Sequence, residues 1–123
     1  MGARTPKNRT DREVAKAIAL QLPDVELNSH HGTMDLRVRN KVFATFPAES
    51  KHAVLRCAAD ALASALQENP EIYSRARGDI WLQVDLEQID RGTLRKLLIR
   101  AWLEAAPPQL RARHEGELDA RIR

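Results

Sequence analysis

The stretch MDLRVRNKVFATF, residues 34–46, constrains the fold of this 123-residue chain more than any other segment. Its first half alternates apolar and polar side chains, and this period of two predicts a strand with one buried face. Asn40, after Arg39, tolerates the positive φ that tight hairpin turns require. A two-residue turn there, the arrangement we prefer, would place Leu36 opposite Phe43. A loop one residue longer would reverse the buried face of the second strand. Both arrangements predict an antiparallel hairpin.

Helices are predicted on both sides of this hairpin. Thr10, with Glu13 three residues later, has the capping-box pattern of a helix N-terminus, and Pro23 should end that helix. Residues 59–69 predict a second helix that stops before a proline. The clearest helix follows Asp90, its candidate N-cap. Apolar side chains recur there at helical spacing and predict a buried stripe: Leu94, Leu97, Leu98, Ala101, Trp102 and Ala105.

Two further segments predict strands. Residues 52–57 are a third strand candidate, and residues 72–86 a second hairpin with its turn at Gly78 and Asp79. One face of the returning strand is apolar: Ile80, Leu82, Val84 and Leu86. The predicted order is α-β-β-β-α-β-β-α plus a tail helix. This order indicates an α+β fold of two layers, with an antiparallel sheet of about five strands and helices on one face.

A single domain is predicted between two less ordered ends. Residues 1–9 are expected to form a flexible basic leader, residues 10–106 the α+β domain, and residues 107–123 a charged, partly helical tail. No apolar run approaches the roughly 20 residues of a membrane-spanning helix, and the start has no export signal. A lone cysteine, Cys57, makes no internal disulfide. We therefore expect a cytoplasmic protein. For its oligomeric state we favour a monomer.

Basic side chains gather at the tips of the two predicted hairpins. The chain carries a formal charge of +3, unevenly spread along its length. Arginine and lysine at such tips can contact phosphates with little sequence preference, or can simply keep hairpin edges soluble. Binding requires both tips to lie on one side of the molecule. The candidate nucleic-acid-binding residues are Arg37, Arg39, Lys41, Arg75 and Arg77.

Other chemistry-bearing residues point to no reaction. Trp81 faces away from the predicted core, either to stack on a base or to pack against the C-terminal tail. His30 and His31, in a predicted connecting loop, have no metal-ligand spacing with other residues. No glycine-rich phosphate loop and no nucleophile with its base is present. We expect no metal, no cofactor and no catalysis, although a pocket joining His31 and Trp81 would indicate a small-molecule site.

The sequence resembles the MmcQ/YjbR-like proteins. The resemblance rests on ALQLPDVELNSHHGTMDLRVRNKVFATF (19–46), WLQVDL (81–86) and LRKLLIRAW (94–102), and extends over about residues 13–106. Where that family usually has glycine, this chain has Asn40, which accommodates the same backbone conformation. The resemblance implies a compact α+β domain with a double-wing arrangement that binds DNA, without an agreed set of catalytic residues.

We therefore expect a non-enzymatic domain that binds nucleic acid, in the first place DNA, through phosphate contacts of its hairpin tips. The alternative is a protein-interaction or chaperone-like adaptor module that lends a sheet edge or an apolar groove to a partner. An exposed apolar patch beside the sheet would favour the adaptor. A continuous positive surface would favour nucleic-acid binding.

Overall fold

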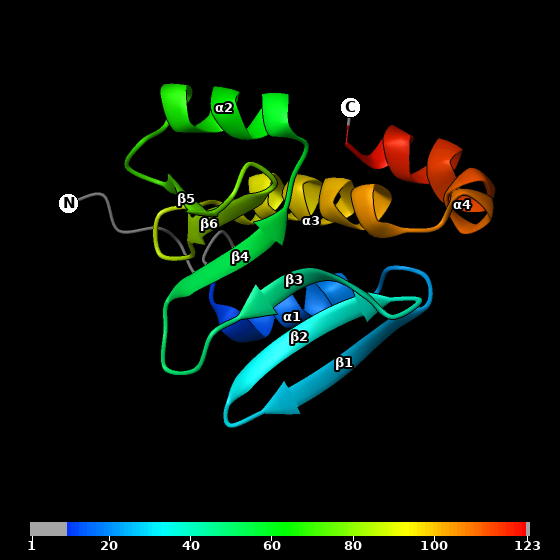
Figure 1. The fold of residues 1–123 in the computed structure, drawn as a ribbon, viewed down its shortest axis with the longest axis horizontal. Helices are drawn as coiled ribbons and strands as arrows, with labels where there is room; N and C mark the ends of the chain where they lie inside the picture. Colours follow the sequence, from blue (N-terminus) through cyan, green and yellow to red (C-terminus); the bar gives the residue numbers. More distant parts are fainter. Residues whose placement is uncertain (1–9, 123) are drawn as a thin grey trace.

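A computed structural model describes residues 10–122 of the chain (Figure 1). This part of the chain forms four helices and one six-stranded sheet. In chain order the elements are α1 (Arg12–Leu20), β1 (Val25–His30), β2 (Thr33–Val38), β3 (Lys41–Phe46), β4 (His52–Arg56), α2 (Ala59–Glu68), β5 (Tyr73–Arg77), β6 (Trp81–Asp85), α3 (Arg91–Ala105) and α4 (Pro108–Arg121). The leader predicted for residues 1–9 lies outside the described residues.

The sheet is antiparallel throughout and has the strand order β1-β2-β3-β4-β6-β5. The first four strands follow one another as a meander. After β4 the chain crosses through α2 to the edge strand β5 and returns as β6, which lies between β4 and β5. Helix α3 packs against β3 and β4, and α1 packs against α3. The predicted α+β fold is confirmed.

The sheet has six strands, not about five, because residues 25–30 form a strand that the sequence pattern did not predict. All residues of β1 except Val25 are exposed, so its burial does not alternate as that of β2 does. At the edge of the sheet it pairs with β2 alone, and it also contacts α1. His30 therefore belongs to β1, and the predicted connecting loop is a two-residue turn at His31 and Gly32, whose φ angles are 52° and 84°.

The first basic hairpin has the predicted turn but a different register. Arg39 and Asn40 make a two-residue turn with φ angles of 49° and 69°. Beyond it, a β-bulge shifts the pairing, so that Leu36 lies opposite Ala44 and not opposite Phe43. A bulge sets two residues of one strand against one of the other. Phe43 and Ala44 are consequently both fully buried.

The second hairpin has a longer loop than predicted. Arg77 pairs with Trp81, which leaves Gly78, Asp79 and Ile80 in a three-residue loop. Ile80 is 39% exposed and does not extend the apolar face of β6. Gly78 has a φ of 55°, the left-handed conformation that such a loop requires and that glycine adopts most readily.

Asp11, not Thr10, caps α1. The Asp11 carboxylate accepts a hydrogen bond from the backbone N–H of Val14, at 2.9 Å. Thr10 is buried, and its hydroxyl lies within hydrogen-bonding distance of the backbone carbonyls of Leu86 and Ile89. Thr10 therefore joins the start of α1 to the segment after β6, a role that local sequence pattern does not encode.

The core lies between the sheet and the helices α1 and α3. Its largest fully buried side chains include Leu36, Phe43, Phe46, Leu82, Leu98 and Trp102. The Trp102 indole N–H donates a hydrogen bond to the carbonyl of Pro23, at 2.9 Å, so its polar atom is satisfied inside the core. Trp102 thus fixes α3 to the segment that joins α1 to β1.

The C-terminal tail forms one helix, α4. Its apolar residues Leu110 and Leu118 are buried, and Arg111 donates a hydrogen bond to the backbone carbonyl of Leu103 near the end of α3, at 3.0 Å. These contacts make the tail part of the packed structure. None of the helices in residues 10–122 has the length and apolar character needed to cross a membrane.

Asp90 is expected to stabilise α3 in a pH-dependent way. Its carboxylate accepts hydrogen bonds from the backbone N–H and the hydroxyl of Thr93, at 2.9 and 2.8 Å, and these bonds lower the pKa of Asp90. A lowered pKa means that the stabilisation is present above the ordinary carboxyl pKa of about 3.9 and is lost as the pH falls through the folded value. We expect Asp90→Ala to cost about 1 kcal/mol at neutral pH and less near pH ~2, measured by urea unfolding.

Asp90→Asn is the control for this effect, because asparagine also caps helices but does not titrate. The difference in stability between Asp90→Asn and Asp90→Ala should be the same at both pH values, whereas the advantage of the wild type over each variant should shrink near pH ~2. An equal cost of Asp90→Ala at neutral and acidic pH would contradict the proposed role of the charge.

Candidate nucleic-acid interface

The face of the sheet opposite the helices carries a row of side chains that crosses five strands. Cross-strand partners share a face of a sheet, and residues two apart in one strand do so as well. Arg37 of β2 is paired with Val42 of β3, and Arg56 of β4 is paired with Trp81 of β6, which is paired with Arg77 of β5. The strand neighbours of Arg56 and Trp81, Leu55 and Leu82, point into the core. We call Arg37, Val42, Arg56, Trp81 and Arg77 the cross-strand row.

Trp81 lies between Arg56 and Arg77 in this row. The guanidinium carbons of Arg56 and Arg77 lie 5.0 and 4.8 Å from the centroid of its ring. Both distances are within the range of cation–π attraction. The Nε of Arg56 also donates a long hydrogen bond, 3.4 Å, to the carbonyl of Val42. The ring therefore holds two cationic groups beside each other on the uncovered face.

Both hairpin tips lie at the same end of the sheet as the cross-strand row. β2 and β4 run in one direction and β3 and β6 in the other. The turn at residues 39–40, the end of β4 and the loop at residues 78–80 therefore share one end. Since neighbouring strands are about 4.8 Å apart, the row from β2 to β5 spans roughly 20 Å. This placement meets the geometric condition for a shared cationic surface.

Three of the five candidate residues lie next to carboxylates. Arg39 donates to a carboxylate oxygen of Asp24 from Nε and Nη2, at 3.2 and 2.9 Å. Arg75 pairs with Asp79 at 2.6 Å. Arg37 lies 3.7 Å from the Asp35 carboxylate. Acidic neighbours therefore offset much of the charge of the two tips, which weakens the case for the tips alone.

The remaining cations have no such neighbour. In the part of the chain that the structure describes, neither Arg77, Arg56 nor Lys41 forms an ion pair with a carboxylate. Lys41 is exposed as the first residue of β3. The net positive charge at this end of the sheet thus lies on the uncovered face and at the start of β3, between the two tips.

Comparison with known proteins places the chain in a family. The family model described as YjbR matches residues 20–104, more than half of the chain. The chain belongs to the YjbR family. The crystal structure of the Deinococcus radiodurans protein DR2400, which has the DUF419 domain, matches this YjbR-family protein with a TM-score of 0.73 and 15% sequence identity. The match covers 94% of this chain and 91% of that one, and at this identity it establishes the fold. No curated protein matches the sequence.

Arg56 is the residue of this YjbR-family protein that the sequence did not suggest as a site residue. Its alternation with the buried Ala53 and Leu55 indicates that it points away from the core. Its place beside Trp81, however, depends on the pairing of β4 with β6, which are separated by α2 and β5. Trp81 does not pack against the tail, because α4 lies on the helical side of the sheet.

The histidines of this YjbR-family protein form no site with Trp81. His31 is in the turn between β1 and β2, at the opposite end of the sheet from Trp81. Its ring lies 4.1 Å from that of His30 in an edge-on contact. Within residues 10–122, no group of three or more histidine, cysteine or acidic side chains could hold a metal ion. The idea of a small-molecule site joining His31 and Trp81 is therefore wrong.

Proposed function

We propose that this YjbR-family protein binds nucleic acid without catalysing a reaction, and that the cross-strand row and Lys41 form the contact surface. The observation that supports this proposal is the position of Arg56 and Arg77 over Trp81, on an uncovered sheet face and without carboxylate partners in residues 10–122. The hairpin tips flank this surface. Arg39 and Arg75 contribute less than the sequence suggests, because Asp24 and Asp79 pair with them.

The chemistry of the row suits a phosphate backbone. Guanidinium groups donate two hydrogen bonds to one phosphate and keep their charge at every physiological pH. A row of roughly 20 Å can contact several successive phosphates of one strand. Phosphate contacts carry little sequence information. We therefore expect DNA or RNA to bind with little preference among sequences.

Trp81 gives the surface a second kind of contact. Its ring is partly exposed, and an exposed aromatic ring can stack on an unpaired base. Arg56 and Arg77 can move from the ring to phosphates when a base takes their place. Binding in this mode favours single strands over duplexes, because duplex bases are already stacked.

The adaptor alternative has less support. β1 offers a free edge with Leu27 39% exposed, but Glu26, Asn28 and His30 also lie on this strand. Polar and charged side chains on an edge strand discourage the addition of another strand. The free edge is therefore weaker support for a partner than the row is for a polyanion.

Salt-dependent binding of a short oligonucleotide tests the proposal. Four cations, Arg37, Lys41, Arg56 and Arg77, would displace counterions from a single strand, so log affinity should fall against log salt with a slope of about −2 to −3. The measurement is fluorescence anisotropy of a labelled single strand of about 12 nucleotides between about 20 and 200 mM salt. Two unrelated sequences should bind within about threefold of each other.

A duplex of the same length completes the test. Weaker binding of the duplex than of the single strand would support the stacking role of Trp81. No binding at the lowest salt, or affinity that does not change with salt, would contradict the proposed function itself.

A further inference from the structure

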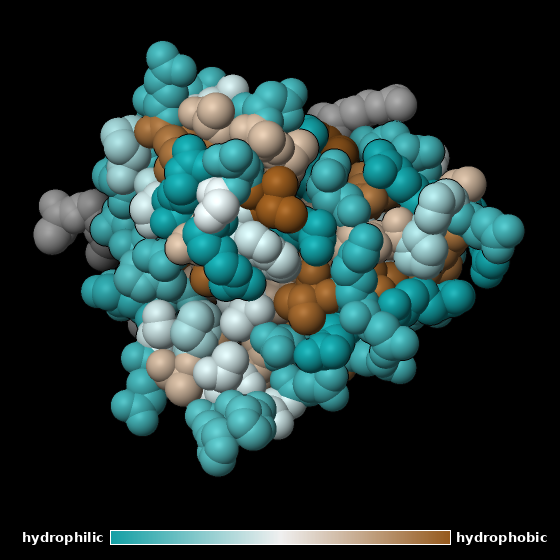
Figure 2. Space-filling view, in the orientation of Figure 1, coloured by the Kyte–Doolittle hydropathy of each residue, from teal (hydrophilic) through white to brown (hydrophobic). Residues whose placement is uncertain are grey.

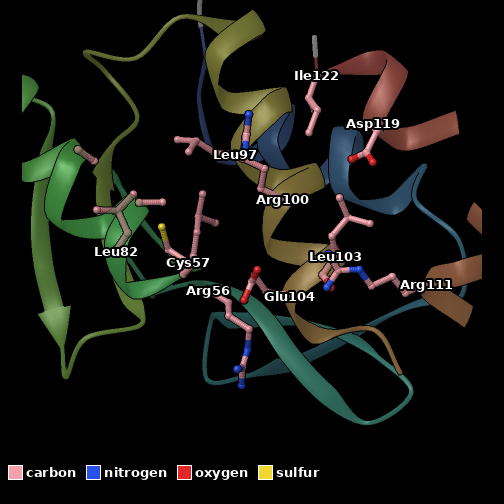
Figure 3. Close-up of a pocket in the computed structure, with 14 residues that line it drawn as sticks. Arg56, Cys57, Leu82, Leu97, Arg100, Leu103, Glu104, Arg111, Asp119 and Ile122 are labelled. Atoms are coloured by element: carbon pink, nitrogen blue, oxygen red, sulfur yellow. The ribbon is translucent and has the colours of Figure 1, made fainter. Parts of the chain in front are cut away.

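A second candidate site lies on the helical side of the sheet, where α2, α3 and α4 meet. It is a cavity of about 200 Å³ that is partly open to solvent. Residues of the sheet and of all three helices line it, and Figure 3 shows their side chains. Figure 2 shows apolar side chains reaching the surface in the region between α2 and α4, among hydrophilic ones. The cavity lies on the opposite side of the sheet from Trp81.

The cavity exists because α2 presents small side chains to it. Ala61 and Ala65 line it from α2, and their spacing of four residues places both on one face of the helix. Larger side chains of α3, Leu97 and Leu103, line it as well. Leu62 is the buried residue of α2. Where α2 has alanine, its side chains are too short to fill the space in front of α3.

The inner wall of the cavity is apolar and is incompletely covered. Leu55 and Leu82 of the sheet line it and belong to the core. Leu97 and Ile122 also line it but are only partly buried, so part of their apolar surface faces the cavity. A ligand that removes such surface from water is bound more tightly. Since an apolar cavity of roughly 150 Å³ in another protein holds benzene, this one has room for a benzene ring with a small substituent.

The charged side chains around the cavity do not converge on one point. Figure 3 shows Arg100, Glu104 and Asp119 at separate places around it. Within residues 10–122 no ion pair joins any of these three side chains. A charged ligand in the interior would lose its hydration without a group of opposite charge placed to receive it, which is costly.

Two further arginines line the cavity but are engaged with other parts of the protein. Arg111 donates hydrogen bonds to the Glu115 carboxylate and the Leu103 carbonyl, at 3.2 and 3.0 Å. The guanidinium carbon of Arg56 lies 5.0 Å from the centroid of the Trp81 ring, and Figure 3 shows its side chain leading away from the cavity. Neither arginine therefore offers its charge to a ligand inside, and the cavity favours a neutral molecule.

We propose that this cavity binds a small neutral molecule built on an apolar six-membered ring. The ring occupies the space that the alanines of α2 leave in front of Leu97 and Leu103. Recognition comes from the fit of an apolar shape, without ionic contacts. Because the cavity and the cross-strand row lie on opposite sides of the sheet, this site does not depend on the proposed binding of nucleic acid.

Protection of Cys57 from alkylation tests the site, because Cys57 is the single cysteine of the chain and lines the cavity. The experiment measures the rate of its reaction with iodoacetamide in the full-length protein, with toluene as the probe, and mass spectrometry follows the alkylated fraction. We expect about 3 mM toluene to slow the reaction about fourfold, which corresponds to a dissociation constant of about 1 mM.

Charged relatives of toluene test the preference for a neutral ligand. Benzoate and benzylamine have the same ring with a carboxylate or an ammonium group. Each should bind at least about tenfold more weakly, so that about 3 mM slows the reaction by no more than about 1.3-fold. No protection by toluene would overturn the site, and equal protection by all three compounds would overturn its preference.

Two phenylalanine variants of α2 locate the bound ring. Ala65→Phe places a ring in the cavity, so toluene should no longer change the alkylation rate of that variant. Ala63→Phe is the matched control, because Ala63 is exposed on the same helix and does not line the cavity; it should keep the fourfold effect. If circular dichroism shows that Ala65→Phe does not fold, Ala61→Phe takes its place. Full protection in a folded cavity-filling variant would contradict the proposed site.

Discussion

Reversal of the charges of Arg56 and Arg77 in one variant is expected to lower the affinity for a single-stranded oligonucleotide about 100-fold at low salt. Each substitution removes a phosphate contact and places a carboxylate in its position, and each contact contributes roughly a tenfold change in affinity. Both residues lie on the uncovered sheet face, and within residues 10–122 a long hydrogen bond from Arg56 is the only one that joins either side chain to the backbone. The fold should therefore tolerate Arg56→Glu with Arg77→Glu, and fluorescence anisotropy measures the loss.

A control variant with the same change of total charge tests whether binding depends on the cross-strand row or only on the net charge of the protein. Arg95 and Lys96 lie on α3, on the helical side of the molecule. Their joint replacement by glutamate should change the affinity by no more than about threefold when both double variants are compared at ~0.1 M salt, where the Debye length is about 10 Å. Equal losses in both double variants would show that total charge controls binding, and the proposed surface would then be wrong.

Replacement of Trp102 by alanine is expected to lower the free energy of unfolding by about 3–5 kcal/mol. Trp102 is fully buried, and its indole N–H bonds to the Pro23 carbonyl. The substitution leaves a large cavity under α3 and an unsatisfied carbonyl group. Since domains of this size are stable by only about 5–15 kcal/mol, we expect a marked fall in the urea midpoint, followed by far-UV circular dichroism.

Trp81→Ala is the matched control, because the chain has two tryptophans and this one lies on the uncovered face. Its loss should cost about 1 kcal/mol or less in stability, while it weakens binding to single strands. If Trp81→Ala destabilises the protein as much as Trp102→Ala, the assignment of one tryptophan to the core and the other to the surface is wrong.

The sequence predicted those parts of the fold that are encoded locally. In residues 34–38 every second residue is buried, as in a strand, and after Asp90 the buried residues recur at helical spacing. Both patterns can be read directly from the sequence. β1 escaped prediction because its burial pattern has no period; only its partner β2 defines it. The bulge that places Phe43 and Ala44 together in the core also arises from packing, which residue alternation does not specify.

The candidate sites depend more than the fold does on contacts between segments that are distant in the sequence. Arg37 and Arg77 could be nominated from hairpin patterns, but the pairing of Arg56 with Trp81 joins strands separated by a helix and an edge strand. The neutralising partner of Arg39, Asp24, lies fifteen residues away and comes close only because β1 pairs with β2. Residues of β4, β6 and three helices line the cavity beside Cys57, so no single segment predicts it.

The insertion of β6 between β4 and β5 has a consequence for synthesis of the chain. The meander β1 to β4 joins neighbours in sequence, whereas His52 of β4 pairs with Asp85 of β6. A nascent chain that has not yet reached residue 85 leaves one backbone edge of β4 without its partner, and the apolar face of the meander still lacks α3. Most of the chain must therefore leave the ribosome before the sheet is complete and its apolar face is covered.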